Sequence, residues 1–219
     1  MKLEGEYLFN GPREKVWEIV RDPEVLATAL PGTQSLNKVG DNEYEGTMQV
    51  RIGPVAGNFA GRLIVSDEVP PESCTLTVEG RGAPGFATGS GHVYLLEQEE
   101  GTTLLKYEGE IQIGGKLASV GQRLLDTASK SLIHQGLEAL NSALQARIKA
   151  EATGTAVEYT PPTEARFAAA VARDMAREMV RALPPPPTMA LIALVAAVAL
   201  LIGFLLGRRA GGRGRAEAA

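Results

Sequence analysis

Hydrophobic and polar residues alternate along most of the first 115 residues of the chain. The alternation is strict over residues 43–52, where Tyr44 and Met48 share one side and Glu45 and Arg51 share the other. Comparable runs cover residues 2–9, 57–69, 74–80, 86–97 and 102–113. Because successive side chains of a strand point to opposite faces, the pattern predicts an antiparallel sheet with one solvent-exposed face and one face covered by other elements.

A helical period follows the predicted strands. Leucine and alanine recur every three to four residues from Leu117 to about Lys149, which predicts one long helix that covers the sheet. Two shorter helices are predicted near the N-terminus, over residues 12–21 and 22–30. The order of one strand, two short helices, about six strands and a long helix predicts an α+β fold, a curved antiparallel sheet around a C-terminal helix.

Small residues recur on the faces that we expect to be covered. The long helix carries Gly136, Ala139 and Ala143 in its second half, and the inward strand positions include Gly46, Gly61, Gly89, Gly91 and Gly109. Facing small residues leave volume that is either a packing defect or a ligand cavity. A core filled by larger neighbouring side chains is the alternative.

The residues expected to line such a cavity are the larger side chains in phase with the covered faces. Tyr107 is the one member of this set with a polar group. The set is Met48, Phe59, Leu63, Val78, Val93, Tyr107, Ile111, Leu124, Ala128 and Leu132.

An uninterrupted apolar run of 18 residues covers residues 189–206. A helix of this length spans roughly 27 Å, close to the thickness of a bilayer core. We therefore expect a single transmembrane helix, with a buried core helix as the alternative. Arginines on both sides leave the orientation undecided by charge, but the N-terminus has no export signal. The main domain is thus expected to face the cytoplasm, anchored in the inner (cytoplasmic) membrane.

The segment before the apolar run is typical of a linker that contains an amphipathic helix, over residues 164–183. Its arginines either contact anionic headgroups at the membrane surface or belong to a solvated helix. The predicted organisation is a folded domain, a linker with a proline-rich spacer, a membrane helix and an arginine-rich tail, at residues 1–150, 151–188, 189–206 and 207–219. The expected membrane-interface residues are Arg166, Arg173, Arg177, Arg181, Arg208 and Arg209.

Charge and motif content exclude several classes of function. Residues 1–150 carry 14 Lys and Arg against 20 Asp and Glu, which argues against a nucleic-acid partner. Two histidines and one cysteine predict no metal site, and no catalytic constellation stands out. A glycine pattern at residues 80–85 matches a dinucleotide fingerprint, but Pro84 interrupts it and a strand pattern follows, so a hairpin is expected.

Four short motifs resemble a known family. They are Phe-Asn-Gly-Pro at residues 9–12, Asp-Pro at 22–23, Leu-Pro-Gly at 30–32 and Gly-Gly-Lys-Leu-Ala-Ser-Val-Gly-Gln-Arg-Leu at 114–124. With them, residues 1–150 resemble the CoxG group of carbon monoxide dehydrogenase subunits, which belongs to the SRPBCC superfamily. The chain departs from the group at Thr33, where a cysteine is frequent, and at residues 136–137, where two phenylalanines are frequent. These departures would widen the space near the second half of the long helix.

The resemblance implies a helix-grip fold of the START and Bet v1 type and a non-catalytic accessory role. It implies a molybdenum-containing carbon monoxide dehydrogenase or a related hydroxylase as partner, recruited to the lipid bilayer. It also implies a hydrophobic small molecule as carried ligand, a quinone such as menaquinone or ubiquinone, with no covalently bound cofactor. Tyr107 is then the candidate for a quinone carbonyl. The alternatives are a ligand-free structural anchor and a small-molecule cyclase or hydrolase with the same fold.

Overall fold

The computed structural model describes residues 1–30, 32–154, 159, 169, 173 and 176. The predicted membrane helix, the arginine-rich tail and most of the linker lie outside these residues, among them Arg166, Arg177, Arg181, Arg208 and Arg209. Within the described residues, no helix is both long enough and apolar enough to cross a bilayer. The predicted membrane span and the predicted domain boundaries therefore stay predictions.

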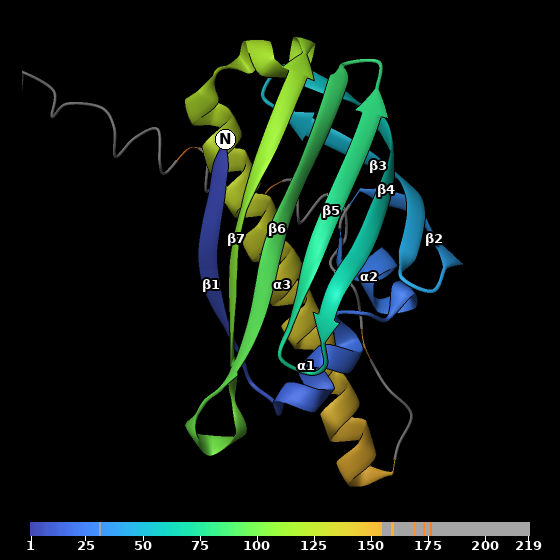
Figure 1. Ribbon diagram of the computed structural model, residues 1–219, viewed down its shortest axis with the longest axis vertical. Helices are drawn as coiled ribbons and strands as arrows, with labels where there is room; N and C mark the ends of the chain where they lie inside the picture. Colours follow the sequence, from blue (N-terminus) through green and yellow to red (C-terminus); the bar gives the residue numbers. More distant parts are fainter. Residues whose placement is uncertain (31, 155–158, 160–168, 170–172, 174–175, 177–219) are drawn as a thin grey trace, which may run out of the picture. The chain divides into compact units, whose positions relative to one another are not determined.

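The described chain forms a single antiparallel sheet with the strand order β1-β7-β6-β5-β4-β3-β2 (Figure 1). The N-terminal strand pairs with the last one, so that Gly5 lies opposite Tyr107. The sequence pattern located every strand except β2, whose side chains are mostly exposed at the sheet edge. The strands are β1 Lys2–Phe9, β2 Thr33–Gly40, β3 Glu43–Ile52, β4 Val55–Val69, β5 Ser73–Gly82, β6 Gly85–Glu97 and β7 Thr103–Gly115.

In the described part of the chain, three α-helices cover one face of this sheet, as Figure 1 shows. They are α1 Arg13–Ile19, α2 Pro23–Ala29 and α3 Gln122–Thr153, with short 3-10 turns η1 Glu99–Gly101 and η2 Lys116–Val120. The long helix begins five residues later than its leucine pattern predicts, because Gly121 has a φ of 94° that an α-helix does not allow. The α+β helix-grip prediction is confirmed.

Two apolar clusters hold α3 on the sheet. One joins the second half of α3 to α1, α2 and the ends of β1, β6 and β7, and it includes Phe9, Val16, Leu95, Leu140 and Leu144. The other joins the first turns of α3 to β3, β4 and η2, and it includes Ile52, Phe59, Leu117, Leu125 and Ala128.

The small residues of α3 have a different role from the one expected. Gly136, Ala139 and Ala143 are buried, and a Cβ on Gly136 would lie 3.2 Å from Leu30 at the end of α2. Ala139 and Ala143 belong to the cluster that contains α1 and α2 residues. These positions are small because the two short helices pack closely against α3, and not because they leave open volume.

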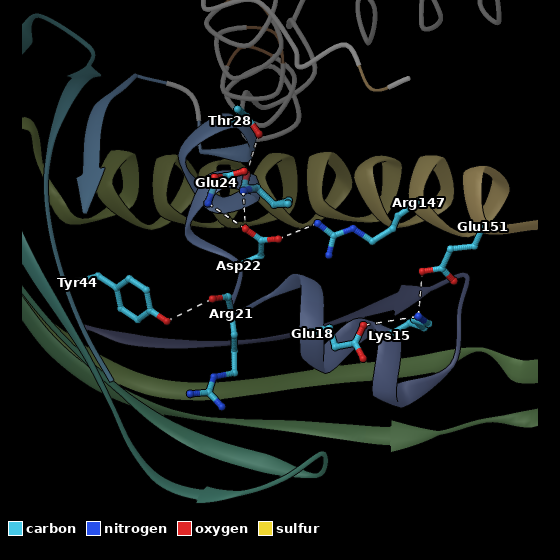
Figure 2. A network of polar contacts seen from close by, with 10 residues as sticks. Lys15, Glu18, Arg21, Asp22, Glu24, Thr28, Tyr44, Arg147 and Glu151 are labelled. Atoms are coloured by element: carbon cyan, nitrogen blue, oxygen red, sulfur yellow. Dashed lines mark hydrogen bonds and ion pairs between the residues drawn. The ribbon is translucent and has the colours of Figure 1, made fainter. Parts of the chain in front are cut away.

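Polar contacts fix the position of α2 (Figure 2). Asp22 caps the helix by accepting from the backbone amides of Glu24 and Val25, and its other oxygen accepts from Arg147 of α3 at 2.7 Å. Burial alone would raise the pKa of Asp22, but the hydrogen bonds from Arg147 and the two amides outweigh it and lower the pKa. The carboxylate therefore stays ionised at neutral pH and ties the α1–α2 segment to α3.

Candidate functional site

A cavity of about 460 Å³ lies between the inner face of the sheet and the helices. This volume falls within the range of small-molecule sites, about 300–1,000 Å³. Its walls come from three parts of the fold: the central strands, the α1–α2 segment and the middle of α3. The larger apolar and aromatic side chains in these walls are Leu3, Trp17, Val20, Leu26, Leu30, Tyr44, Leu63, Val65, Leu76, Val78, Val93, Leu105, Tyr107, Ile111, Ile133, Leu137 and Leu140.

Glycines of β6 and β7 form part of the cavity wall. Gly89, Gly91 and Gly109 line it, whereas Gly46 and Gly61 do not. Gly91 lies opposite Gly109, and a Cβ on Gly109 would come within 2.5 Å of the Ser90 carbonyl oxygen. The two strands thus approach too closely for side chains here, and the missing side chains leave room above the sheet.

The structure brings together five of the ten residues expected to line the cavity. Leu63, Val78, Val93, Tyr107 and Ile111 lie in its wall. Whether any of them contacts a ligand stays a prediction.

The other five expected residues lie outside the cavity wall. Phe59 and Ala128 are buried in the cluster at the start of α3, and Leu124 packs against that cluster. Met48 and Leu132 are partly buried elsewhere. For Phe59, Leu124 and Ala128 the reason is that β3, β4 and the first turns of α3 converge at this end of the fold, and their side chains fill the space between them.

The α1–α2 segment is the part of the wall that sequence reasoning missed. Trp17, Val20 and Arg21 line the cavity from the end of α1 and the residues just after it, and Leu26 and Leu30 line it from α2. The three-residue spacing of Trp17 and Val20 marks an inward helical face, but it does not say which part of the sheet that face meets. On β5, Cys74 and Leu76 alternate in phase with Val78, which is the signal that points them inward.

A charged pair lies at the α1 end of the wall. The Arg21 guanidinium contacts both carboxylate oxygens of Glu68, at 2.5 and 3.1 Å, and also donates to Asn42 at 2.9 Å. The same guanidinium lies over the Trp17 ring, 5.4 Å from its centroid. Tyr44 donates from its hydroxyl to the Arg21 carbonyl oxygen at 3.3 Å, which holds the backbone in place (Figure 2).

An irregularity in β4 places Glu68 beside Arg21. The register shifts between Ser66 and Val69, and Asp67 has a φ of 48°. Strict alternation from the inward Val65 would direct Glu68 to the solvent face. The bulge changes this phase, and the Glu68 side chain is only 14% exposed where it meets Arg21.

The Cys74 and Tyr107 side chains of the wall are uncharged at neutral pH. Burial raises the pKa of the Cys74 thiol, with Glu68 raising it further and Arg21 opposing. Burial also raises the pKa of Tyr107, and Lys130 opposes the shift. Both groups therefore stay protonated near neutral pH.

The ionisable residues of β6 and β7 beside the cavity turn their side chains away from it. His92, Glu108 and Glu110 belong to strand segments that line the cavity, but they alternate with inward residues and their side chains are exposed. The His92 ring lies 3.0 Å from the Thr75 hydroxyl on the outer face, and His134 on α3 is also exposed, as expected. Among the described residues, no group of three or more His, Cys, Asp and Glu side chains is arranged to hold a metal ion.

Comparisons with known proteins agree with this geometry. The family model of CoxG, described as a carbon monoxide dehydrogenase subunit, matches residues 5–145. A conserved protein of Geobacillus kaustophilus is 30% identical, with a TM-score of 0.64 over 66% of this chain and 95% of the other. No curated protein matches significantly.

More distant solved structures share the fold alone. A START superfamily protein of Mycobacterium smegmatis is 12% identical, with a TM-score of 0.51 over 66% of this chain and 97% of its own. The ZhuI aromatase/cyclase of Streptomyces sp. R1128 is 14% identical, with a TM-score of 0.52 over 71% of this chain and 99% of its own.

Proposed function

The chain belongs to the CoxG family of carbon monoxide dehydrogenase subunits, and from this premise we propose that it is a non-catalytic accessory protein that carries a hydrophobic ligand in its cavity. The family match bears out the resemblance seen in the sequence. The observation that carries the proposal is the cavity itself, whose wall is made almost wholly of apolar side chains and glycine backbone.

A quinone is the ligand that we propose. An isoprenoid tail gains about 25 cal/mol for each Å² of apolar surface that leaves water, and the cavity offers apolar walls on all three sides. A quinone ring adds carbonyl oxygens that accept hydrogen bonds from the few polar groups of the wall. Menaquinone and ubiquinone both have this chemistry.

The partner and the membrane attachment belong to the same proposal. The family name supports a carbon monoxide dehydrogenase as partner. We propose that this partner is of the molybdenum type, or a related hydroxylase. The apolar run at residues 189–206 supports a single membrane helix, with the described domain on the cytoplasmic side of the inner membrane. In this arrangement the protein recruits the enzyme to the bilayer, and its bound quinone passes electrons to the respiratory chain.

Catalysis is the alternative that the Streptomyces aromatase/cyclase raises. A cyclase or hydrolase needs titratable groups that converge on the bound substrate. In the described wall, Arg21 is engaged by Glu68 and Asn42, and the pKa values of Cys74 and Tyr107 are raised by burial. These features favour a binding role over a chemical one.

Quenching of the single tryptophan tests ligand binding. Trp17 lines the cavity, and quinones quench tryptophan fluorescence on contact. We expect decylubiquinone to quench the full chain, held in amphipol, along a saturable curve that ends at one ligand per chain. A V39F variant should titrate in the same way, because Val39 is 52% exposed and outside the cavity wall. A ligand-free anchor would show only weak quenching that rises linearly with quinone.

A further inference from the structure

Arg21 brings a charged side chain to the cavity wall, and this charge is half of an ion pair instead of a lone charge. Arg21 lines the cavity, and Glu68 holds its guanidinium through both carboxylate oxygens. The Arg21 and Glu68 side chains are 28% and 14% exposed, so water screens the pair only partly. The two charges cancel, and the local field is that of a dipole.

The guanidinium is fixed in place by its surroundings. It lies over the Trp17 ring and donates to Asn42, and Tyr44 anchors its backbone carbonyl. Figure 2 shows its side chain directed away from the Asp22–Arg147 contact. Its Nε is buried, without a hydrogen-bond partner among the described residues and out of reach of a ligand. Of the four Nη hydrogens, three are directed to Glu68 and Asn42, which leaves one Nη1 hydrogen as a free donor.

A ligand head placed here meets the Arg21 guanidinium, whose charge is balanced by Glu68 beside it but outside the cavity wall. A carbonyl oxygen accepts a hydrogen bond from the guanidinium and loses little on leaving water. A carboxylate meets the same donor but is repelled by Glu68, and its desolvation in an apolar cavity is left uncompensated. Cys74, which senses both charges, and Tyr107 elsewhere in the wall stay protonated and add no charge.

We propose that the Arg21–Glu68 pair is the binding site for the polar head group of the ligand, and that it selects an uncharged hydrogen-bond acceptor over a carboxylate. This inference rests on the proposed ligand-carrying function and adds the class of head group that the cavity accepts. Amphiphiles with a neutral carbonyl, quinones among them, are bound with the head beside Trp17, and fatty acids are rejected.

The test is a competition against decylubiquinone at neutral pH, read by recovery of Trp17 fluorescence in the full chain in amphipol. Methyl dodecanoate and dodecanoate differ only in the charge and methylation of the head. We expect the ester to displace the quinone at a concentration at least about tenfold lower than the acid. In E68Q, where Arg21 is left uncompensated, the acid should gain about tenfold and the difference should shrink or reverse.

E43Q is the matched control. Glu43 forms an ion pair with Arg62 across β3 and β4, and neither residue lines the cavity. This variant should keep the wild-type preference. If circular dichroism shows that E68Q does not fold, the comparison of acid and ester on the wild-type chain still tests the proposal. Equal displacement of the quinone by the acid and the ester would overturn the assignment.

The outcomes separate this inference from the function on which it rests. If decylubiquinone quenches saturably while acid and ester compete equally, or while a folded E68Q keeps the wild-type preference, the result overturns the head-group site alone. Absence of saturable quenching in the wild-type chain overturns the ligand-carrying function, and with it the proposed head-group site.

Discussion

Filling the cavity with two tryptophans, L76W and L137W together, is expected to lower the affinity for decylubiquinone by at least about tenfold. Leu76 lines the cavity from β5 and Leu137 lines it from α3, so the new rings enter it from opposite walls. Leu76 and Leu137 pack at the margins of two core clusters, but the added ring volume enters the cavity. The free energy of unfolding should therefore fall by no more than about 1–3 kcal/mol. Binding is measured as quinone absorbance retained by the full chain after gel filtration, which is insensitive to the added tryptophans.

The matched control places the same two rings on the surface. V39W and V69W together add tryptophans at side chains that are each 52% exposed and outside the cavity wall. This variant should bind decylubiquinone as the wild type does. Undiminished binding by the cavity double variant, with its fold intact, would mean that the quinone binds elsewhere.

The largest expected effect on stability is that of F9A, a loss of about 3–5 kcal/mol in the free energy of unfolding. Phe9 is fully buried at the end of β1, and its ring packs edge-on against Tyr7 with centroids 5.0 Å apart. It belongs to the cluster that joins β1 to α1 and α3, so its removal leaves a void that fixed elements cannot close. Urea unfolding followed by Trp17 fluorescence measures the change.

The neighbouring residue is the control for F9A. Leu8 is 50% exposed on the opposite face of β1, so L8A should change the free energy of unfolding by about 0.5 kcal/mol or less. A loss below about 1 kcal/mol for F9A would contradict the assignment of this cluster as one of the two that hold α3 on the sheet.

The covered face of the sheet was predictable because its alternation is regular. Val93, Tyr107 and Ile111 lie on the inner face of the sheet that their phase predicts, since each belongs to a run without irregularity. Glu68 was not predictable in this way, because a bulge at Asp67 changes the phase of β4 and no residue type in that run announces it.

The point at which the cavity ends, near the start of α3, was not predictable from periodicity. Ala128 and Phe59 are in phase with the inward face, but whether an inward side chain lines a void or fills a core depends on how close the facing elements lie. Ala128 is fully buried, so a tryptophan there would overpack the core instead of blocking the cavity. Arg21 was missed for a related reason: only the packing of α1 against the sheet shows that its side chain meets the cavity.

Methyl resonances give the most direct test that the hollow beneath α3 is where a neutral apolar ligand sits. In the full chain with labelled leucine and valine methyls, decylubiquinone should shift the signals of Leu63, Leu76, Val93 and Leu137, which line the cavity. The signals of Leu144 and Leu125, buried in the two core clusters and absent from the cavity wall, should move far less. Shifts confined to exposed methyls such as those of Leu8 and Leu96, or no shifts at saturating quinone, would contradict the account.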